Sequence, residues 1–304
     1  MRRLQIVTEI RRAIEQHEFC LWYQPIVDLE TGRLAGFEAL IRWQHPQRGF
    51  IAPDEFIPIA EETGMIILLG QWVLYEACRQ LRHWQEQTQS DSALTVNVNL
   101  SGKEVMQPDL IKRVRKVLDE TGLDPTCLKL EITESVAMQD AEATIETMRQ
   151  LRAMGIHMCV DDFGTGFSSL QYLNQFPIQM LKIDRSFVGT MDPDSESIAI
   201  VKAIILLAHA LNIDVVAEGV ETIEHLVQLQ GMGCEYGQGY LFAQALDSDA
   251  AGTLFINEVA QQQSVFPPET LTEEPKTEEP KVVDDSEGSF ELAQWSFHWL
   301  WRMG

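Results

Sequence analysis

Six short apolar segments of this chain each carry a carboxylate, an amide or a lysine at or near their carboxyl end. They are residues 37–40, 96–99, 128–131, 159–162, 180–184 and 215–218. A strand buried on both faces has a continuous apolar sequence, and charged side chains are tolerated where it reaches solvent or a metal ion. The pattern therefore predicts parallel strands whose polar ends meet at one edge. In a (β/α)₈ barrel that edge is the carboxyl-terminal mouth, where catalytic side chains come from several strands.

Helical patterns alternate with these strands. Apolar residues recur at spacings of three and four over 2–17, 66–88, 103–119, 138–154, 195–211 and 220–231. Two further strands are expected at 21–28 and 236–242, which brings the set close to eight. Alternation of strands with helices favours a parallel sheet, and this number of strands favours its closure into a barrel.

The first two strands depart from the standard barrel. Only about five residues separate 21–28 from 34–42, which is the spacing of a hairpin and too short for a crossover helix. We therefore expect an α/β, TIM-like (β/α)₈ barrel with one antiparallel strand.

The periodic pattern stops near Ala260 and divides the chain into three parts. Residues 1–260 are expected to form the barrel. Residues 261–289 are rich in acidic residues and proline, which predicts a disordered linker. In the carboxyl-terminal segment 290–304, Trp295, Phe297, Trp299 and Trp301 alternate, a pattern that suits either an aromatic face for a protein partner or membrane surface, or packing against the barrel itself.

The formal net charge of −23 argues against binding of a nucleic-acid polymer, because phosphate contacts need clustered Lys and Arg. The five cysteines include no Cys-x-x-Cys pair and lie in apolar stretches, so buried thiols are expected rather than disulfides or a zinc site. The start of the chain lacks the apolar core of a signal peptide, and no apolar run is long enough to cross a membrane. A cytoplasmic location is the expectation.

Side chains alternate along a strand, so Glu38 shares a face with Arg42, Asn97 with Asn99, and Lys129 with Glu131. Several carboxylates cannot converge unpaired, because like charges in a cleft raise each other's pKa or need a cation. All-oxygen ligands favour Mg²⁺ or Mn²⁺ over Zn²⁺. A site that holds two such ions suits hydrolysis of a phosphodiester.

In its motifs the chain resembles the EAL-domain family of cyclic di-GMP phosphodiesterases over roughly residues 4–248. The motifs include Glu-Ala-Leu at 38–40 and Asp-Asp-Phe-Gly at 161–164. The matching segments are 23–28, 38–43, 99–101, 131–135, 161–166, 182–184, 217–221 and 237–240. The family's barrel also has one antiparallel strand. One departure follows 237–242, where the family usually has a proline and this chain has Ala243 to Leu246.

The resemblance implies a role for each matching residue. The implied metal ligands are Glu38, Asn99, Glu131 and Asp161, with Asp162 bridging or binding the second ion. Glu218 would be the base or a metal partner, Lys182 would hold the attacking water, and Glu134 would anchor the Asp-Asp-Phe-Gly loop. Gln24, Arg42 and Gln238 match substrate-contacting positions, and the guanidinium of Arg42 could pair with a phosphate.

The implied reaction is hydrolysis of cyclic di-GMP to linear pGpG by a water activated by two Mg²⁺ or Mn²⁺ ions. The resemblance also implies a homodimer. Two alternatives stay open on the residues alone. One is a cyclic di-GMP receptor that binds without turnover and signals through a partner. The other is a metal-dependent phosphatase or lyase that acts on a different small substrate.

Overall fold

The computed structural model describes residues 2–88, 94–166, 170–191 and 195–261. Its strands are β1 (Phe19–Asp28), β2 (Leu34–His45), β3 (Gly49–Ile51), β4 (Thr95–Asn99), β5 (Leu128–Thr133), β6 (His157–Phe163), β7 (Met180–Ile183), β8 (Asp214–Glu218) and β9 (Tyr236–Gln238). The predicted linker at 261–289 begins at Gln261, which is the last residue of the final helix. The rest of it and the aromatic segment at 290–304 lie outside the described residues.

The helices mostly lie between these strands. They are α1 (Arg2–Glu15), α2 (Pro53–Thr63), α3 (Ile66–Thr88), α4 (Gly102–Val105), α5 (Leu110–Thr121), α6 (Glu134–Gln139), α7 (Ala141–Arg152), α8 (Leu170–Leu173), α9 (Arg185–Val188), α10 (Glu196–Ala210), α11 (Ile223–Gly231) and α12 (Ser248–Gln261). A 3₁₀ turn, Pro125–Cys127, precedes β5.

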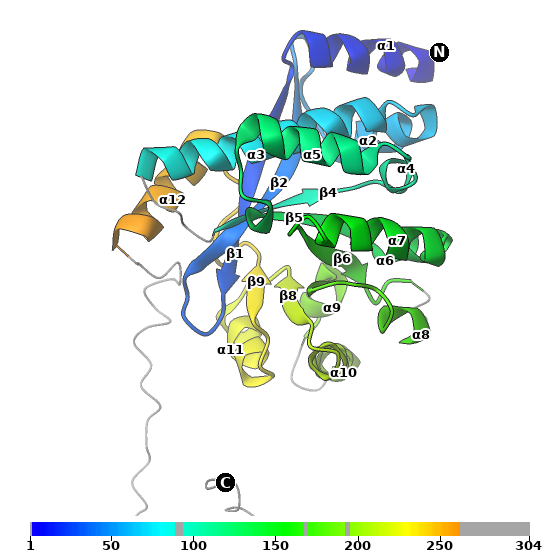
Figure 1. Ribbon diagram of the computed structural model, residues 1–304. Coiled ribbons are helices and arrows are strands. Elements are labelled where there is room, and N and C mark those ends of the chain that lie inside the picture. Colours follow the sequence, from blue (N-terminus) through cyan, green and yellow to red (C-terminus); the bar gives the residue numbers. More distant parts are fainter. Residues whose placement is uncertain (1, 89–93, 167–169, 192–194, 262–304) are drawn as a thin grey trace, which may run out of the picture.

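The sheet closes on itself, as the strand count predicts. Its order is β1-β9-β8-β7-β6-β5-β4-β2, and β1 pairs with β2 to complete the ring. All neighbours from β2 through β4 to β9 are parallel, whereas β1 is antiparallel to both β2 and β9. The short β3 pairs antiparallel with the end of β2, outside the ring. Within the ring β1 is the antiparallel strand, as the hairpin spacing predicted. Figure 1 shows the helices packed around the outside of this barrel.

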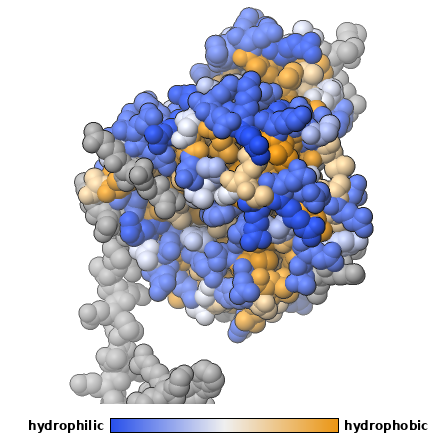
Figure 2. Space-filling model, viewed as in Figure 1, coloured by the Kyte–Doolittle hydropathy of each residue, from blue (hydrophilic) through white to orange (hydrophobic). Residues whose placement is uncertain are grey.

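The core follows from the burial of both strand faces. Val96 and Val98 on β4, and Leu128 and Leu130 on β5, are fully buried where the helices cover the barrel. The face of the molecule in Figure 2 is largely hydrophilic, with smaller hydrophobic areas between the hydrophilic ones. No helix in the described part of the chain is both long and apolar enough to cross a membrane.

A second apolar cluster extends the barrel at its carboxyl-terminal mouth. The long strand β2 continues past Arg42, so Trp43 reaches beyond the ring and packs on Phe19 and Phe56. Helix α1 joins the same cluster through Ile10, and Figure 1 shows α1 above α2 at this end. The incoming helix therefore lies on the mouth side of the barrel.

Three expectations about the elements need correction. The predicted helix 103–119 is two helices, α4 and α5, and 138–154 is replaced by α6 and α7. The strand expected at 236–242 ends at Gln238. There the chain turns because Gly239 lies against the backbone of Val220, where an added Cβ would come within 2.2 Å of the Val220 carbonyl oxygen.

Candidate active site

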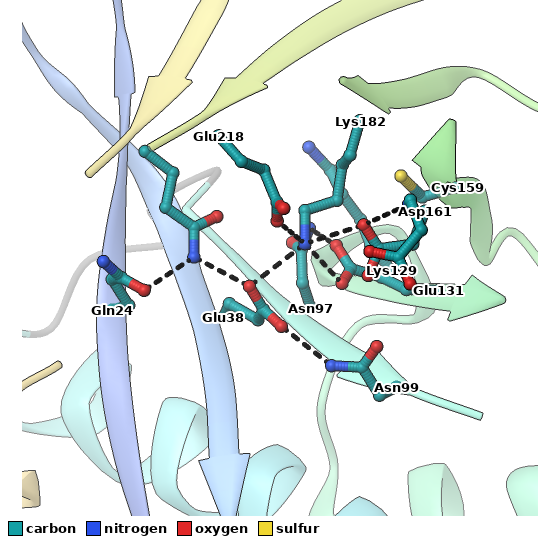
Figure 3. A network of polar contacts seen from close by, with 12 residues as sticks. Gln24, Glu38, Asn97, Asn99, Lys129, Glu131, Cys159, Asp161, Lys182 and Glu218 are labelled. Atoms are coloured by element: carbon teal, nitrogen blue, oxygen red, sulfur yellow. Dashed lines mark hydrogen bonds and ion pairs between the residues drawn. The ribbon is translucent and has the colours of Figure 1, made fainter. Parts of the chain in front are cut away.

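A buried lysine is the centre of the polar cluster inside the barrel. Strand β7 carries Lys182 into the interior, where its side chain is 1% exposed. Its Nζ lies 2.6 Å from Glu218 Oε1, 3.0 Å from Glu131 Oε2, 3.1 Å from Glu38 Oε2 and 3.4 Å from Asp161 Oδ1. These carboxylates come from β8, β5, β2 and β6, and Figure 3 shows them converging on the lysine. The barrel thus brings together the strand-end residues that the sequence pattern predicted would converge.

Side-chain amides hold Glu38 in place. Gln238 Nε2 donates to Glu38 Oε2 at 2.7 Å, and Asn99 Nδ2 donates to Glu38 Oε1 at 2.8 Å. The same Gln238 amide donates to Gln24 Oε1 at 3.0 Å. Both carboxylate oxygens of Glu38 are therefore hydrogen-bonded, which fixes the orientation of the carboxylate. Gln24 and Gln238, expected to contact substrate, also position this carboxylate.

Asn97 is a member of the site for which sequence reasoning assigned no role. Its Nδ2 donates to Glu131 Oε1 at 2.6 Å, while its own Oδ1 has no hydrogen-bond partner among the described residues. The residue is completely buried on β4, two positions before Asn99. The alternation that put both amides on one face was the available signal. The bond to Glu131 depends on the pairing of β4 with β5, which periodicity does not specify.

The buried carboxylate of Glu134 holds the loop after β6. Glu134, the first residue of α6, is 1% exposed, and its Oε2 accepts a hydrogen bond from Gly164 N at 2.9 Å. Asp162, just before this loop, has a left-handed backbone with φ of 54°. Such a conformation is uncommon outside glycine, although Asp tolerates it better than most residues. Glu134 thus supports the segment that carries the carboxylates of Asp161 and Asp162.

Burial and charge pull the pKa values of the site in opposite directions. Burial raises the pKa of Glu131 to about 8 and that of Glu218 to about 7, against the attraction of Lys182. Burial also acts on Glu38, but Lys182 and the two amides outweigh it and lower the pKa of that group. The pKa of Lys182 is well above its usual value, because the surrounding carboxylates outweigh its burial.

The donor set fits divalent cations. Ligand atoms of Glu38, Glu131 and Asp161 lie within 4.8 Å of one another, and so do those of Asp161, Asp162 and Glu218. Asp161 belongs to both groups, so the two would be adjacent. Carboxylate oxygen is the donor that Mg²⁺ and Mn²⁺ prefer, and the raised pKa of Asp162, caused by burial and the neighbouring Asp161, indicates an excess of negative charge.

Arg42 lies outside the acidic cluster. Its guanidinium lies 5.5 Å from the centre of the Trp22 ring and donates to Ile41 O at 2.9 Å. It is half-buried at the end of the hairpin beside the mouth. This position leaves its expected contact with a substrate phosphate untested.

The fold and this cluster define a class of protein: a closed α/β barrel with an acidic centre at the carboxyl ends of its strands. The EAL domain family matches residues 7–245. The chain therefore belongs to that family.

Curated relatives carry the domain within longer chains. The chain is 44% identical over 247 residues to the bifunctional diguanylate cyclase/cyclic di-GMP phosphodiesterase MucR of Pseudomonas aeruginosa, covering 81% of this chain and 36% of MucR. It is 42% identical over 243 residues to the cyclic di-GMP phosphodiesterase NbdA of the same organism, covering 80% and 31% of the two chains. The chain thus spans about a third of the length of these relatives.

Solved structures share the fold. The PaMucR phosphodiesterase in complex with c-di-GMP is similar with a TM-score of 0.77 and 44% identity, covering 81% of this chain and 99% of that chain. The EAL enzyme Bd1971 in its cAMP-bound form is similar with a TM-score of 0.78 and 39% identity, covering 83% and 70% of the two chains.

Proposed function

We propose that this chain hydrolyses cyclic di-GMP to linear pGpG with two divalent cations, Mg²⁺ or Mn²⁺. The observation that carries the proposal is the pair of adjacent carboxylate groups that share Asp161. The names of MucR and NbdA, and the c-di-GMP in the PaMucR structure, support the choice of substrate.

The proposed metal ligands follow the two carboxylate groups. Glu38, Glu131 and Asp161 would hold one ion, with Asn99 beside them, and Asp161, Asp162 and Glu218 would hold the other. When bound, such ions supply a water of lowered pKa as nucleophile and offset charge on the phosphoryl oxygens. The resemblance implied that Asp162 bridges the ions or binds the second one. Because Asp161 is the residue common to both groups, we propose Asp161 as the shared ligand and Asp162 as a ligand of the second ion.

The chain's own groups would orient the reactants. Lys182 Nζ, 2.6 Å from Glu218 Oε1, lies at the centre of the cluster and can donate to the attacking water. Glu218, whose pKa is raised by burial in the metal-free site, would serve either as a ligand of the second ion or as the base that takes a proton from the water. In the overall reaction the water oxygen forms a bond to phosphorus, one phosphoester bond breaks, and the departing ribose oxygen gains a proton.

Substrate would enter from the mouth. Arg42 is placed beside it and could pair with a phosphate through its two-pronged guanidinium. Gln24 and Gln238 would lie under the substrate and keep Glu38 oriented. The homodimer implied by the resemblance stays a prediction.

The test is product analysis of purified protein incubated with cyclic di-GMP in Mg²⁺, in Mn²⁺ and in chelator. We expect metal-dependent pGpG, with Glu38→Gln lowering turnover by about 10²-fold or more. Glu30→Gln is the matched control, because Glu30 lies in the exposed β1–β2 turn. Calorimetry with the metal alone should show weaker binding by the Glu38 variant. Binding of cyclic di-GMP without any product in either metal would replace the hydrolase by a receptor, and turnover of simple phosphate esters in preference to cyclic di-GMP would replace the substrate.

A further inference from the structure

A cavity lies at the opposite end of the barrel from the acidic cluster. It has a volume of about 920 Å³, within the range of small-molecule sites. Its walls include the first residues of several parallel strands, among them His157 of β6, Met180 of β7 and Asp214 of β8, and Tyr236 of β9 also lines it. The cavity therefore opens at the amino-terminal end, where a (β/α)₈ barrel does not usually place its active site.

A buried lysine that forms no ion pair with a carboxylate among the described residues lines this cavity. Lys129 of β5 is 9% exposed and lines the cavity. Its Nζ lies 3.8 Å from Met180 Sδ and 5.6 Å from the centre of the Tyr236 ring. Among the described residues no carboxylate lies within ion-pair distance of it, and Glu131 and Asp214 attract it only from farther away. An ammonium that is out of water needs an anion or a strong acceptor, and a thioether and a ring face supply only part of that.

Glu258 also lines this cavity, and one of its carboxylate oxygens is buried without a donor among the described residues. Glu258 of α12 is 4% exposed, and its Oε1 accepts from Arg33 Nε at 2.8 Å. Its Oε2 is buried and has no hydrogen-bond partner among the described residues. Buried polar atoms are nearly always hydrogen-bonded, so this atom indicates a missing donor.

We propose that the amino-terminal end of the barrel holds a second binding site, for a small organic anion that also carries N–H donors. Its acidic group would pair with Lys129, and an N–H donor would satisfy Glu258 Oε2. The aromatic and thioether wall of Tyr236 and Met180 would contact the apolar part of the molecule. A nucleoside monophosphate has all three features and a size that suits the cavity. The carboxylates of Asp28 and Asp214 on the rim disfavour a bare polyanion.

The test uses three probes against the metal-free protein in chelator: 5′-GMP, guanosine and inorganic phosphate. Guanosine has the donors without the anion, and phosphate has the anion without the donors. We expect 5′-GMP to bind at least tenfold more tightly than either. Lys129→Met should weaken 5′-GMP binding at least tenfold by calorimetry, and Glu258→Gln should weaken it severalfold.

Two control variants separate this site from the mouth. Arg42→Met changes the mouth, and Lys103→Met removes an exposed lysine; both should leave 5′-GMP affinity unchanged. Loss in Arg42→Met but not in Lys129→Met would assign the binding to the mouth and overturn the proposal, as would no binding of any probe. A crystal of the unaltered protein soaked in 5′-GMP supplies a measurement that no folding defect affects: density beside Lys129 supports the site, and density only at the mouth contradicts it.

Discussion

Two buried lysines point into the same barrel and have opposite surroundings. Lys182, towards the mouth, lies within 3.4 Å of four carboxylates, whereas Lys129, towards the amino end, contacts a sulfur and a ring. Burial lowers the pKa of Lys129, while the carboxylates raise that of Lys182 in spite of equal or deeper burial. The comparison teaches that burial alone does not determine the state of an interior charge, since the neighbouring groups reverse its effect.

The largest expected effect is on Lys182. Lys182→Met leaves four carboxylates without their cation, and removing one partner of a buried ion pair costs about 3–5 kcal/mol. Lys129→Met removes a charge that has no carboxylate partner and inserts an apolar chain, so its free energy of unfolding should change by less than about 1.5 kcal/mol. Urea denaturation of the two metal-free variants measures both. Equal losses in the two would remove the distinction between the ends of the barrel.

The second expectation concerns pH. The raised pKa values of Glu131, about 8, and Glu218, about 7, mean that the folded metal-free protein binds protons more tightly than the unfolded chain. Stability should therefore fall as pH rises from the ordinary range of Glu to about 8. The lowered pKa of Glu38 acts below that range and does not oppose the trend.

Thermal unfolding of the metal-free protein between pH 5 and 8 checks this trend, which should weaken in Glu131→Gln. Added Mg²⁺ should stabilise most at the high end of the window, because ligand carboxylates must lose their protons to bind it. A metal-free stability that rises steadily across the window would contradict the expectation.

A smaller effect is expected at Asn97, which lies between the two regions. Asn97→Ala removes the hydrogen bond to Glu131, so the free energy of unfolding should fall by about 1–3 kcal/mol and the pKa of Glu131 should rise further. Denaturation measures the first, and carboxyl titration by NMR measures the second. Asn97→Asp sharpens the test, because it adds a negative charge beside Glu131 and opposite Lys129 in the strand register. An unchanged Glu131 titration in both variants would mean that the amide has no part in the site.

Much of the barrel could be predicted because its signals are local. Strand ends with polar residues, helical spacing and a five-residue hairpin turn are read along the chain, and the ring with β1 reversed confirms them. Helix α2 was missed because Pro53 and the internal Pro58 argue against a helix, although a proline in the first turn is well tolerated. The division into the acidic linker and aromatic segment stays a prediction.

The sequence predicted which strand-end side chains would lie together, but not the contacts between them. Glu38, Glu131 and Lys182 meet as the strand ends indicated, but the bond from Asn97 and the membership of Asp161 in two carboxylate groups depend on the closed ring. Lys129 was seen as a strand-face partner of Glu131, and only the structure separates the two into different layers of the interior. Register between strands is a property of pairs, so a single strand's alternation cannot supply it.

The antiparallel direction of β1 also determines at which end of the barrel the first helix, α1, and the last helix, α12, lie. In an all-parallel ring of strands and following helices, the chain enters and leaves at the same end. Here β1 starts at the mouth, so α1 packs near Trp43 at that end, whereas α12 brings Glu258 to the amino end. A partner that binds α1 would therefore contact the barrel on the side of the acidic cluster, whereas one that binds the last turns of α12 would contact it on the side of Lys129 and its cavity.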